Sequence, residues 1–253
     1  MKKSILNPAL LSTGLISSLL LLPNITLAAE DAAQAGAEWD GNAELGFIHT
    51  SGNSDTQSLN GKLKVSREEG PFKAGMKLEA LTSEDSGVKS SEKYLAALKF
   101  DYAIGEYDYV TSQALYEDDR FNGYEYQSSV TVGYGYHAWN DENGKLDLEA
   151  GPGYRRDVLE TRDADGDKVK EEAIGRLSLD LLVNISDNAK FTELLTMEAG
   201  DSKTVWKSEM GLQSTLSGSL AMKVSYIVKH TTDVPAENKN TDSLVGVTLV
   251  YDF

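Results

Sequence analysis

The chain ends with the stretch Ser243-Leu-Val-Gly-Val-Thr-Leu-Val-Tyr-Asp-Phe253. Counted back from the end, every second residue is apolar or aromatic: Phe253, Tyr251, Leu249, Val247 and Val245. The residues between them are mixed and include small, polar and acidic side chains. A period of two indicates a β-strand with two different faces. The last residue of the chain is aromatic and lies in phase with the apolar face.

This terminal pattern resembles the closing strand of bacterial outer-membrane β-barrels. In that class a terminal Phe, preceded by apolar and aromatic residues at every second position, is read by the barrel assembly machinery. The resemblance therefore implies that machinery as a partner. The start of the chain agrees with export. Lys2 and Lys3 precede a mostly apolar run over 10–22, and Pro23 and Ala28 follow it, which is the order of parts in a secretory signal peptide.

The domain organisation follows from these signals. We predict a signal peptide over 1–28 that is cleaved near Ala28 after export by the Sec route. A small, acidic and flexible segment follows over 29–38, and a β-barrel over 39–253. The apolar run of the signal is well short of the ~20 residues that a transmembrane helix needs. The chain has no Cys, which excludes disulfides and thiolate zinc sites.

Alternation continues from Trp39 to the end of the chain and predicts an all-β fold, a twelve-stranded antiparallel transmembrane β-barrel. The apolar series should face lipid and the polar, charged series should face the lumen. Residues 107–118 and 190–200 are the two segments in which neither series is clearly apolar. Pro152 predicts a local bulge or strand end, because Pro cannot donate to the ladder. The expected strands lie at about 42–47, 59–66, 72–80, 94–102, 107–118, 124–136, 146–155, 173–184, 190–200, 206–216, 220–229 and 243–253.

The connections divide into two groups. Those after even-numbered strands are short, as at Gly70-Pro71 and 187–189, whereas several after odd-numbered strands are longer and more acidic, notably 85–91, 161–170 and 233–240. This asymmetry is typical of outer-membrane barrels, with short turns in the periplasm and longer loops outside. We therefore predict an outer-membrane location with both termini in the periplasm, where lipids and lipopolysaccharide are the surroundings of the barrel.

The first predicted hairpin reads Gly46-Phe-Ile-His-Thr-Ser-Gly-Asn-Ser-Asp-Thr56. With a Thr-Ser-Gly-Asn-Ser turn and a Leu-Val-Tyr-Asp-Phe end, the chain resembles the salt-induced outer-membrane protein family, catalogued as domain of unknown function 481. The resemblance covers about 39–253. It implies an outer-membrane barrel linked to salt or osmotic stress, and it supplies no catalytic residues.

His49 and Ser51 stand two residues apart on one strand face, a spacing that resembles the Ser–His pair of outer-membrane phospholipase A. Nucleophilic catalysis needs this pair within hydrogen-bond reach and a third orienting group. The alternative function is therefore a barrel-borne lipid hydrolase. The simpler interpretation is a turn Ser and an interfacial His. We expect no enzymatic activity, no catalytic site and no cofactor.

Asp163, Asp165 and Asp167 occupy positions 1, 3 and 5 of a sequence that partly matches a calcium loop. Lys168 replaces the Gly of position 6 and Ile174 the Glu of position 12. The acidic outer loops are thus expected to attract divalent cations, while no defined metal site is predicted.

The number and position of the charged residues predict possible partners and the properties of the lumen. The net charge is −16, which argues against a nucleic-acid partner. Mixed Lys, Arg, Asp and Glu in the polar series are expected to cross-link a narrow lumen. We predict a structural role or a narrow, cation-preferring permeability. The acids expected on the outer rim are Glu84, Asp85, Glu117, Asp118, Asp119, Asp163, Asp165, Asp167, Asp201, Asp233 and Glu237, and the bases are Lys89, Arg120, Arg162, Lys168, Lys170 and Lys239.

Overall fold

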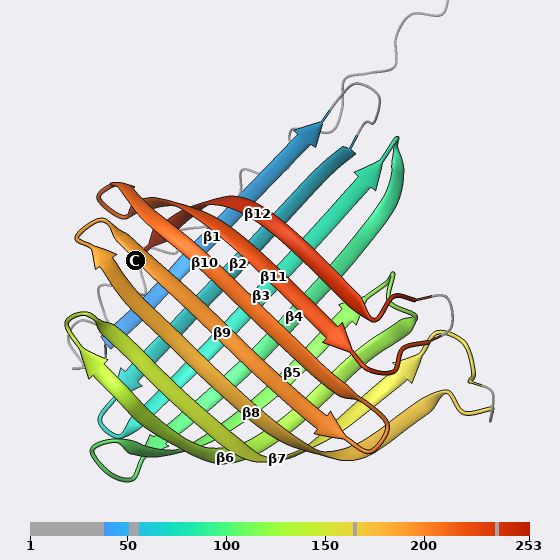
Figure 1. Cartoon of the computed structure of the whole chain (residues 1–253), viewed down its shortest axis with the longest axis horizontal. Coiled ribbons are helices and arrows are strands. Elements are labelled where there is room, and N and C mark those ends of the chain that lie inside the picture. The colour runs from blue at the N-terminus through green and yellow to red at the C-terminus, as the bar shows by residue number, and fades with distance from the viewer. Residues whose placement is uncertain (1–37, 51–55, 164–165, 236–237) are drawn as a thin grey trace, which may run out of the picture. The chain divides into compact units, whose positions relative to one another are not determined.

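The computed structural model of the protein describes residues 38–50, 56–163, 166–235 and 238–253. These residues form a closed antiparallel β-barrel (Figure 1). The strands are β1 (Glu38–Thr50), β2 (Thr56–Glu69), β3 (Phe72–Asp85), β4 (Val88–Ala103), β5 (Asp108–Asp119), β6 (Tyr124–Asp141), β7 (Gly144–Leu159), β8 (Val169–Ser186), β9 (Ala189–Gly200), β10 (Thr204–Ser217), β11 (Leu220–Thr231) and β12 (Thr241–Asp252).

Each strand pairs with its neighbours in sequence, and β12 returns to pair with β1. The predicted twelve-stranded, all-β barrel is therefore confirmed. The predicted signal peptide and all but the last residue of the predicted flexible segment lie outside the described residues. That last residue, Glu38, already belongs to β1. In the described part of the chain no helix is long and apolar enough to span a membrane.

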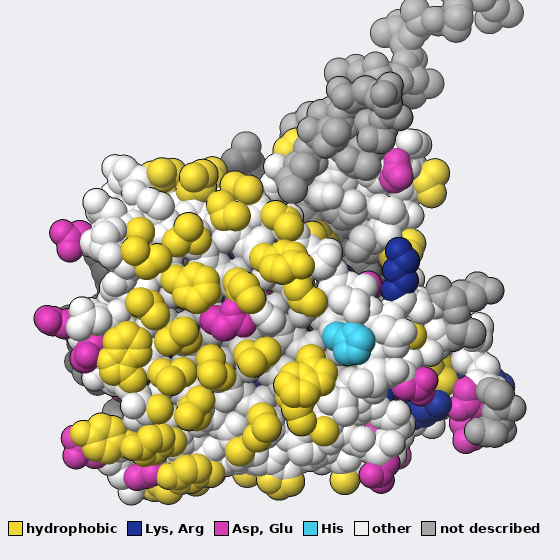
Figure 2. All heavy atoms as spheres, in the orientation of Figure 1, with side chains coloured by type: hydrophobic (Ala, Val, Ile, Leu, Met, Phe, Trp, Pro, Cys, Tyr) yellow, Lys and Arg dark blue, Asp and Glu magenta, His cyan; other side chains and the backbone are white. Residues whose placement is uncertain are grey.

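The two faces of the barrel wall differ as the alternation predicts. Phe47 and Leu45, from the apolar series of β1, are 64% and 63% exposed, whereas Val250 of the mixed series of β12 is fully buried. Hydrophobic side chains gather over the outer surface (Figure 2). An apolar surface of this extent is stable against lipid and not against water. The outward series is thus a lipid-facing surface, and the inward series lines the lumen.

The two segments with weak alternation are both regular strands. In β5 the outward series holds Val110 and Tyr116, while Tyr109 and Thr111 are buried on the lumen side. In β9 the outward series includes Leu195. The pattern is weak in β5 because a large aromatic residue faces inward, and in β9 because a charged residue faces outward.

Two local predictions were wrong. Residues 85–91 do not form a long loop, because β3 and β4 extend toward each other and only Ser86 and Gly87, both with positive φ, connect them. Pro152 neither bulges nor ends its strand. It lies within β7 opposite Gly175 of β8, and on the β6 side the paired positions flank it, at Gly153 and Ala150. The ladder between β6 and β7 is thus interrupted at Gly151 and Pro152 without a shift of register, as expected where Pro has no N–H to donate.

The seam between β1 and β12 is the shortest in the barrel. It has four paired positions, from Asn42–Asp252 to Leu45–Leu249, whereas β1 pairs with β2 along its whole length. Phe253 extends the seam, since its N–H donates to the carbonyl of Gly41 and its carbonyl accepts from the Gly41 N–H, both at 2.9 Å. A Cβ at Gly41 would lie 2.7 Å from the Phe253 ring, so Gly lets the ring approach.

Deletion of Phe253 should therefore reduce the yield of folded, membrane-inserted barrel, because it removes two hydrogen bonds from the seam that closes the wall. The measurement is the heat-modifiable band of folded protein in outer-membrane fractions. Phe253→Trp, which keeps an aromatic ring and the backbone bonds, is the matched control and should assemble well. Recovery of the folded wild type as a soluble periplasmic monomer would contradict the membrane assignment.

Candidate functional site

The lumen is the candidate functional site, and its centre is a cluster of five ion-paired side chains. Lys62 comes from β2, Lys77 and Glu79 from β3, and Lys207 and Glu209 from β10. The alternation of each strand turns these residues inward. Four strands separate β3 from β10 around the wall in one direction and six in the other, so these contacts cross the lumen.

The distances show that four of the five charges in this central cluster are shared between at least two partners. Lys62 Nζ lies 2.9 Å from a carboxylate oxygen of Glu79 and 3.3 Å from one of Glu209. Lys77 Nζ contacts the same two carboxylates at 2.8 and 3.1 Å. Lys207 Nζ approaches Glu209 to 2.6 Å. Mixed charges therefore cross-link the lumen, as the sequence predicts.

A second bridge crosses the lumen nearer the outer end. Glu117 of β5 accepts from Lys229 of β11 at 2.5 Å and pairs with Lys93 of β4 at 3.0 Å. Five strands separate β5 from β11 in both directions, so the Lys229–Glu117 contact spans the barrel. Glu117 was predicted on the outer rim, and this was wrong. Its side chain points into the lumen and is buried there. Asp119 also contacts Lys93, at 3.8 Å.

A third group surrounds Glu149 of β7. This carboxylate accepts hydrogen bonds from Lys99, from the Tyr109 hydroxyl at 2.9 Å and from Arg176 at 3.5 Å. Tyr109 lies flat over Gly135, where a Cβ would come within 2.2 Å of the ring. The glycine in β6 thus lets an inward aromatic side chain reach across to β7 and orient the carboxylate.

The fourth group lies near the outer end, around Arg155 of β7. Its guanidinium pairs with Glu172 and donates to the carbonyl of Lys203 at 2.9 Å. Lys203 Nζ lies 2.7 Å from Asp157 and 3.0 Å from the Tyr124 hydroxyl, with the ammonium 4.3 Å from the Tyr124 ring centre. Each of these buried charges has an opposite charge beside it, which buried charges require.

Tyr124 belongs to the apolar series of the expected strand 124–136, and this series was predicted to face lipid. For Tyr124 the prediction was wrong. The register of β6 against β7 shifts between Tyr124 and Tyr126, which turns Tyr124 inward, where it is buried. A bulge of one residue reverses the face of every residue beyond it. The sequence carried no signal for this bulge, and Lys203 was missed as well because it lies in the short connection between β9 and β10.

The residues of the two weaker sequence hypotheses are only partly described. The backbone of His49 pairs with Gln57 in the β1–β2 ladder, while the His49 side chain and Ser51 lie outside the description, so the hydrolase alternative stays a prediction. Asp163 pairs with Lys170 at 3.2 Å and accepts from the Asp167 N–H at 2.9 Å. Asp165 lies outside the described residues, and the attraction of divalent cations also stays a prediction.

Known proteins agree with this architecture. A closed twelve-stranded barrel with an apolar exterior and a charged interior has the outer-membrane β-barrel fold. A solved structure of the COG4313 outer-membrane channel from Pseudomonas putida F1 matches with a TM-score of 0.51 and 11% identity, over 86% of this chain and 96% of that one. The NanC porin matches with a TM-score of 0.49 and 15% identity, over 85% and 98%.

Residues 43–253 match the family of proteins of unknown function DUF481, and the chain belongs to this family. The uncharacterized protein YdiY of Escherichia coli K12 is similar to it, with 28% identity over 224 residues, which cover 88% of this chain and 86% of YdiY. The sequence resemblance to domain of unknown function 481 is thereby confirmed.

The central cluster should contribute strongly to stability. Glu209→Ala leaves three ammonium groups with one carboxylate among partly buried side chains, and breaking such a pair costs about 3–5 kcal/mol. Glu69→Ala removes the partner of Arg67 from an exposed pair at the end of β2 and should cost less than about 1 kcal/mol. Urea unfolding of both variants in lipid vesicles measures the difference. Equal, small losses would show that the cluster is not a stabilising unit.

Proposed function

We propose that the protein resides in the outer membrane as a narrow barrel of low conductance, with a structural or limited permeability role linked to salt or osmotic stress. The observation that carries the proposal is the pair of bridges across the lumen, from β2 and β3 to β10 and from β5 to β11. Charged side chains from opposite walls meet within hydrogen-bond distance there, so large solutes have no free path.

The bridges also supply a physical link to salt. The Debye length falls from about 10 Å at 0.1 M salt to about 3 Å at 1 M, which is the length of these contacts, and partly buried pairs are screened less than exposed ones. Salt near 1 M therefore weakens the contacts that cross the lumen while it supplies the ions that pass. On this proposal, conductance rises with salt more steeply than the conductivity of the solution does.

Removing the second bridge, between Lys229 and Glu117, should raise the single-channel conductance. Glu117→Ala combined with Lys229→Ala removes both members of the contact across the lumen and leaves Lys93 beside Asp119. We expect a several-fold increase in single-channel conductance in planar bilayers, with a weaker dependence on salt. Glu68→Ala combined with Lys73→Ala removes a pair on one wall at the periplasmic rim and should change neither.

An unchanged conductance in the bridge variant would contradict the role of this contact. Absence of conductance in every variant and at every salt concentration would remove the permeability role and leave the structural one. The two roles proposed here are thus separated by one set of recordings.

The acidic side chains at the outer rim support a preference of the lumen for cations over anions. Asp201 and Asp233, in the connections after β9 and β11, have no base within 4.0 Å among the residues that the structure describes, whereas Lys170 and Arg120 are paired with acids. An excess of acids raises the local concentration of cations and repels anions. The negative potential of these acids acts at the outer entrance of the lumen, before an ion reaches the two bridges.

Asp201→Asn combined with Asp233→Asn should therefore lower cation selectivity, and most strongly at low salt, where screening is weakest. The reversal potential across a salt gradient measures it. Asp187→Asn, a change in a turn at the periplasmic end between β8 and β9, is the control and should have a smaller effect. Anion selectivity of the wild type would overturn the preference.

A further inference from the structure

Glu193 of β9 faces the lipid side of the barrel wall. It lies in the outward series of its strand with Leu195, and its cross-strand partners, Leu181 of β8 and Met210 of β10, belong to outward apolar series too. The neighbouring even-numbered residues point into the lumen, where Glu198 contacts Arg155. A carboxyl group therefore lies among outward-facing apolar side chains, and Figure 2 shows that hydrophobic side chains gather over this outer surface of the barrel.

Several other outward-facing charges have opposite charges beside them. Arg67 pairs with Glu69 and Arg156 with Glu171, in each case near a strand end. Glu193 is the fifth residue of β9, with seven residues beyond it, and no base lies within 4.0 Å of it among the described residues. Its hydrogen bond comes from the Ser208 hydroxyl at 2.7 Å, which engages Oε1 and leaves the other carboxyl oxygen toward lipid.

A carboxyl group that faces lipid with only one of its oxygens hydrogen-bonded is costly, and ionisable residues within a membrane mark functional contacts. We infer that the β8–β10 face binds a second copy of this chain, with Glu193 of each copy at the contact. A two-fold axis along the membrane normal brings identical residues together at identical depth. A carboxyl group in its acid form donates through its O–H and accepts through its C=O, so two such groups are self-complementary.

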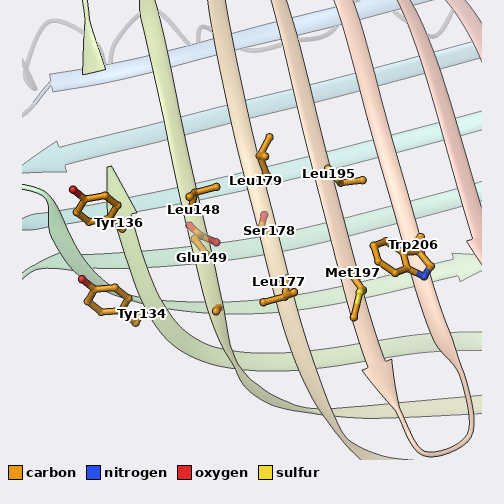
Figure 3. A pocket seen from close by; sticks show the side chains of 11 residues that line it. Tyr134, Tyr136, Leu148, Glu149, Leu177, Ser178, Leu179, Leu195, Met197 and Trp206 are labelled. Atoms are coloured by element: carbon orange, nitrogen blue, oxygen red, sulfur yellow. The ribbon is translucent and has the colours of Figure 1, made fainter. Parts of the chain in front are cut away.

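The surface beside Glu193 is also shaped to receive side chains. A hollow of about 400 Å³ opens over β6 to β10, and its lining includes Leu179, Leu195, Met197 and Trp206 (Figure 3). Leu195 belongs to the same outward series as Glu193 and stands two residues from it. The self-complementary carboxyl group is what selects a second copy over a lipid as the occupant, since an acyl chain satisfies no hydrogen bond.

Cysteine cross-linking in native membranes tests the contact, because the chain has no Cys of its own. Met210→Cys lies across the strand from Glu193 and should form a disulfide-linked dimer on oxidation. Leu98→Cys of β4 is the matched control, since it also faces outward in mid-strand, at 45% exposure, on the opposite side of the ring. We expect at least five times less dimer from Leu98→Cys.

The carboxyl group is tested in the Met210→Cys background. Glu193→Gln retains a donor and an acceptor and should keep the dimer, whereas Glu193→Leu removes both and should reduce it at least five-fold. Undiminished cross-linking with Glu193→Leu, or equal cross-linking from Met210→Cys and Leu98→Cys, would overturn the proposal. Heat-modified migration of each variant shows that the barrel is folded, and the outcome does not depend on whether the lumen conducts.

Discussion

The structure depends on the requirement that every backbone N–H and C=O within lipid finds a partner inside the protein. A sheet meets this requirement only when its first strand pairs with its last. The contact of β1 with β12 is therefore the condition for the fold, although it is the shortest seam. The backbone bonds between Gly41 and Phe253 explain why an aromatic C-terminus belongs to the closing mechanism as well as to the lipid-facing surface.

Closure then dictates where the charges go. Each strand has one face toward lipid and one toward the lumen, so Lys, Arg, Asp and Glu can be numerous only on the inner face. Inside a narrow barrel these side chains reach one another before they reach bulk water, and the contacts of Lys62 and Lys77 with Glu79 and Glu209 result. Loss of Glu209 leaves Lys207 unpaired and leaves Lys62 and Lys77 to share Glu79, which costs more than the pairs contribute. The members of the cluster thus hold one another in place.

The sequence predicted the strand number, the closing strand and the two faces, because these depend on local alternation and on the chain end. It missed the inward turn of Tyr124, because a single-residue bulge has no signature in the alternation. It placed Glu117 on the rim although the expected strand reached residue 118, because the weak alternation of that strand did not show which side chains turn into the lumen. The pairing of Glu117 with Lys229 also depends on which strands lie opposite each other, a property of the closed ring that sequence spacing does not contain.

Shared charges reconcile a barred lumen with limited permeability. Lys62 and Lys77 each contact two carboxylates, so either lysine can release Glu209 and remain paired with Glu79. Glu117 can likewise release Lys229 and remain paired with Lys93. Release of Glu209 by both lysines leaves every charge of the central cluster paired, because Glu209 keeps Lys207. Release of Lys229 separates that lysine from its partner, and complete separation of a buried pair costs about 3–5 kcal/mol. On the proposed function, an ion that enters the gap supplies the missing charge itself, and exchange of partners, without movement of the wall, opens a path through the lumen.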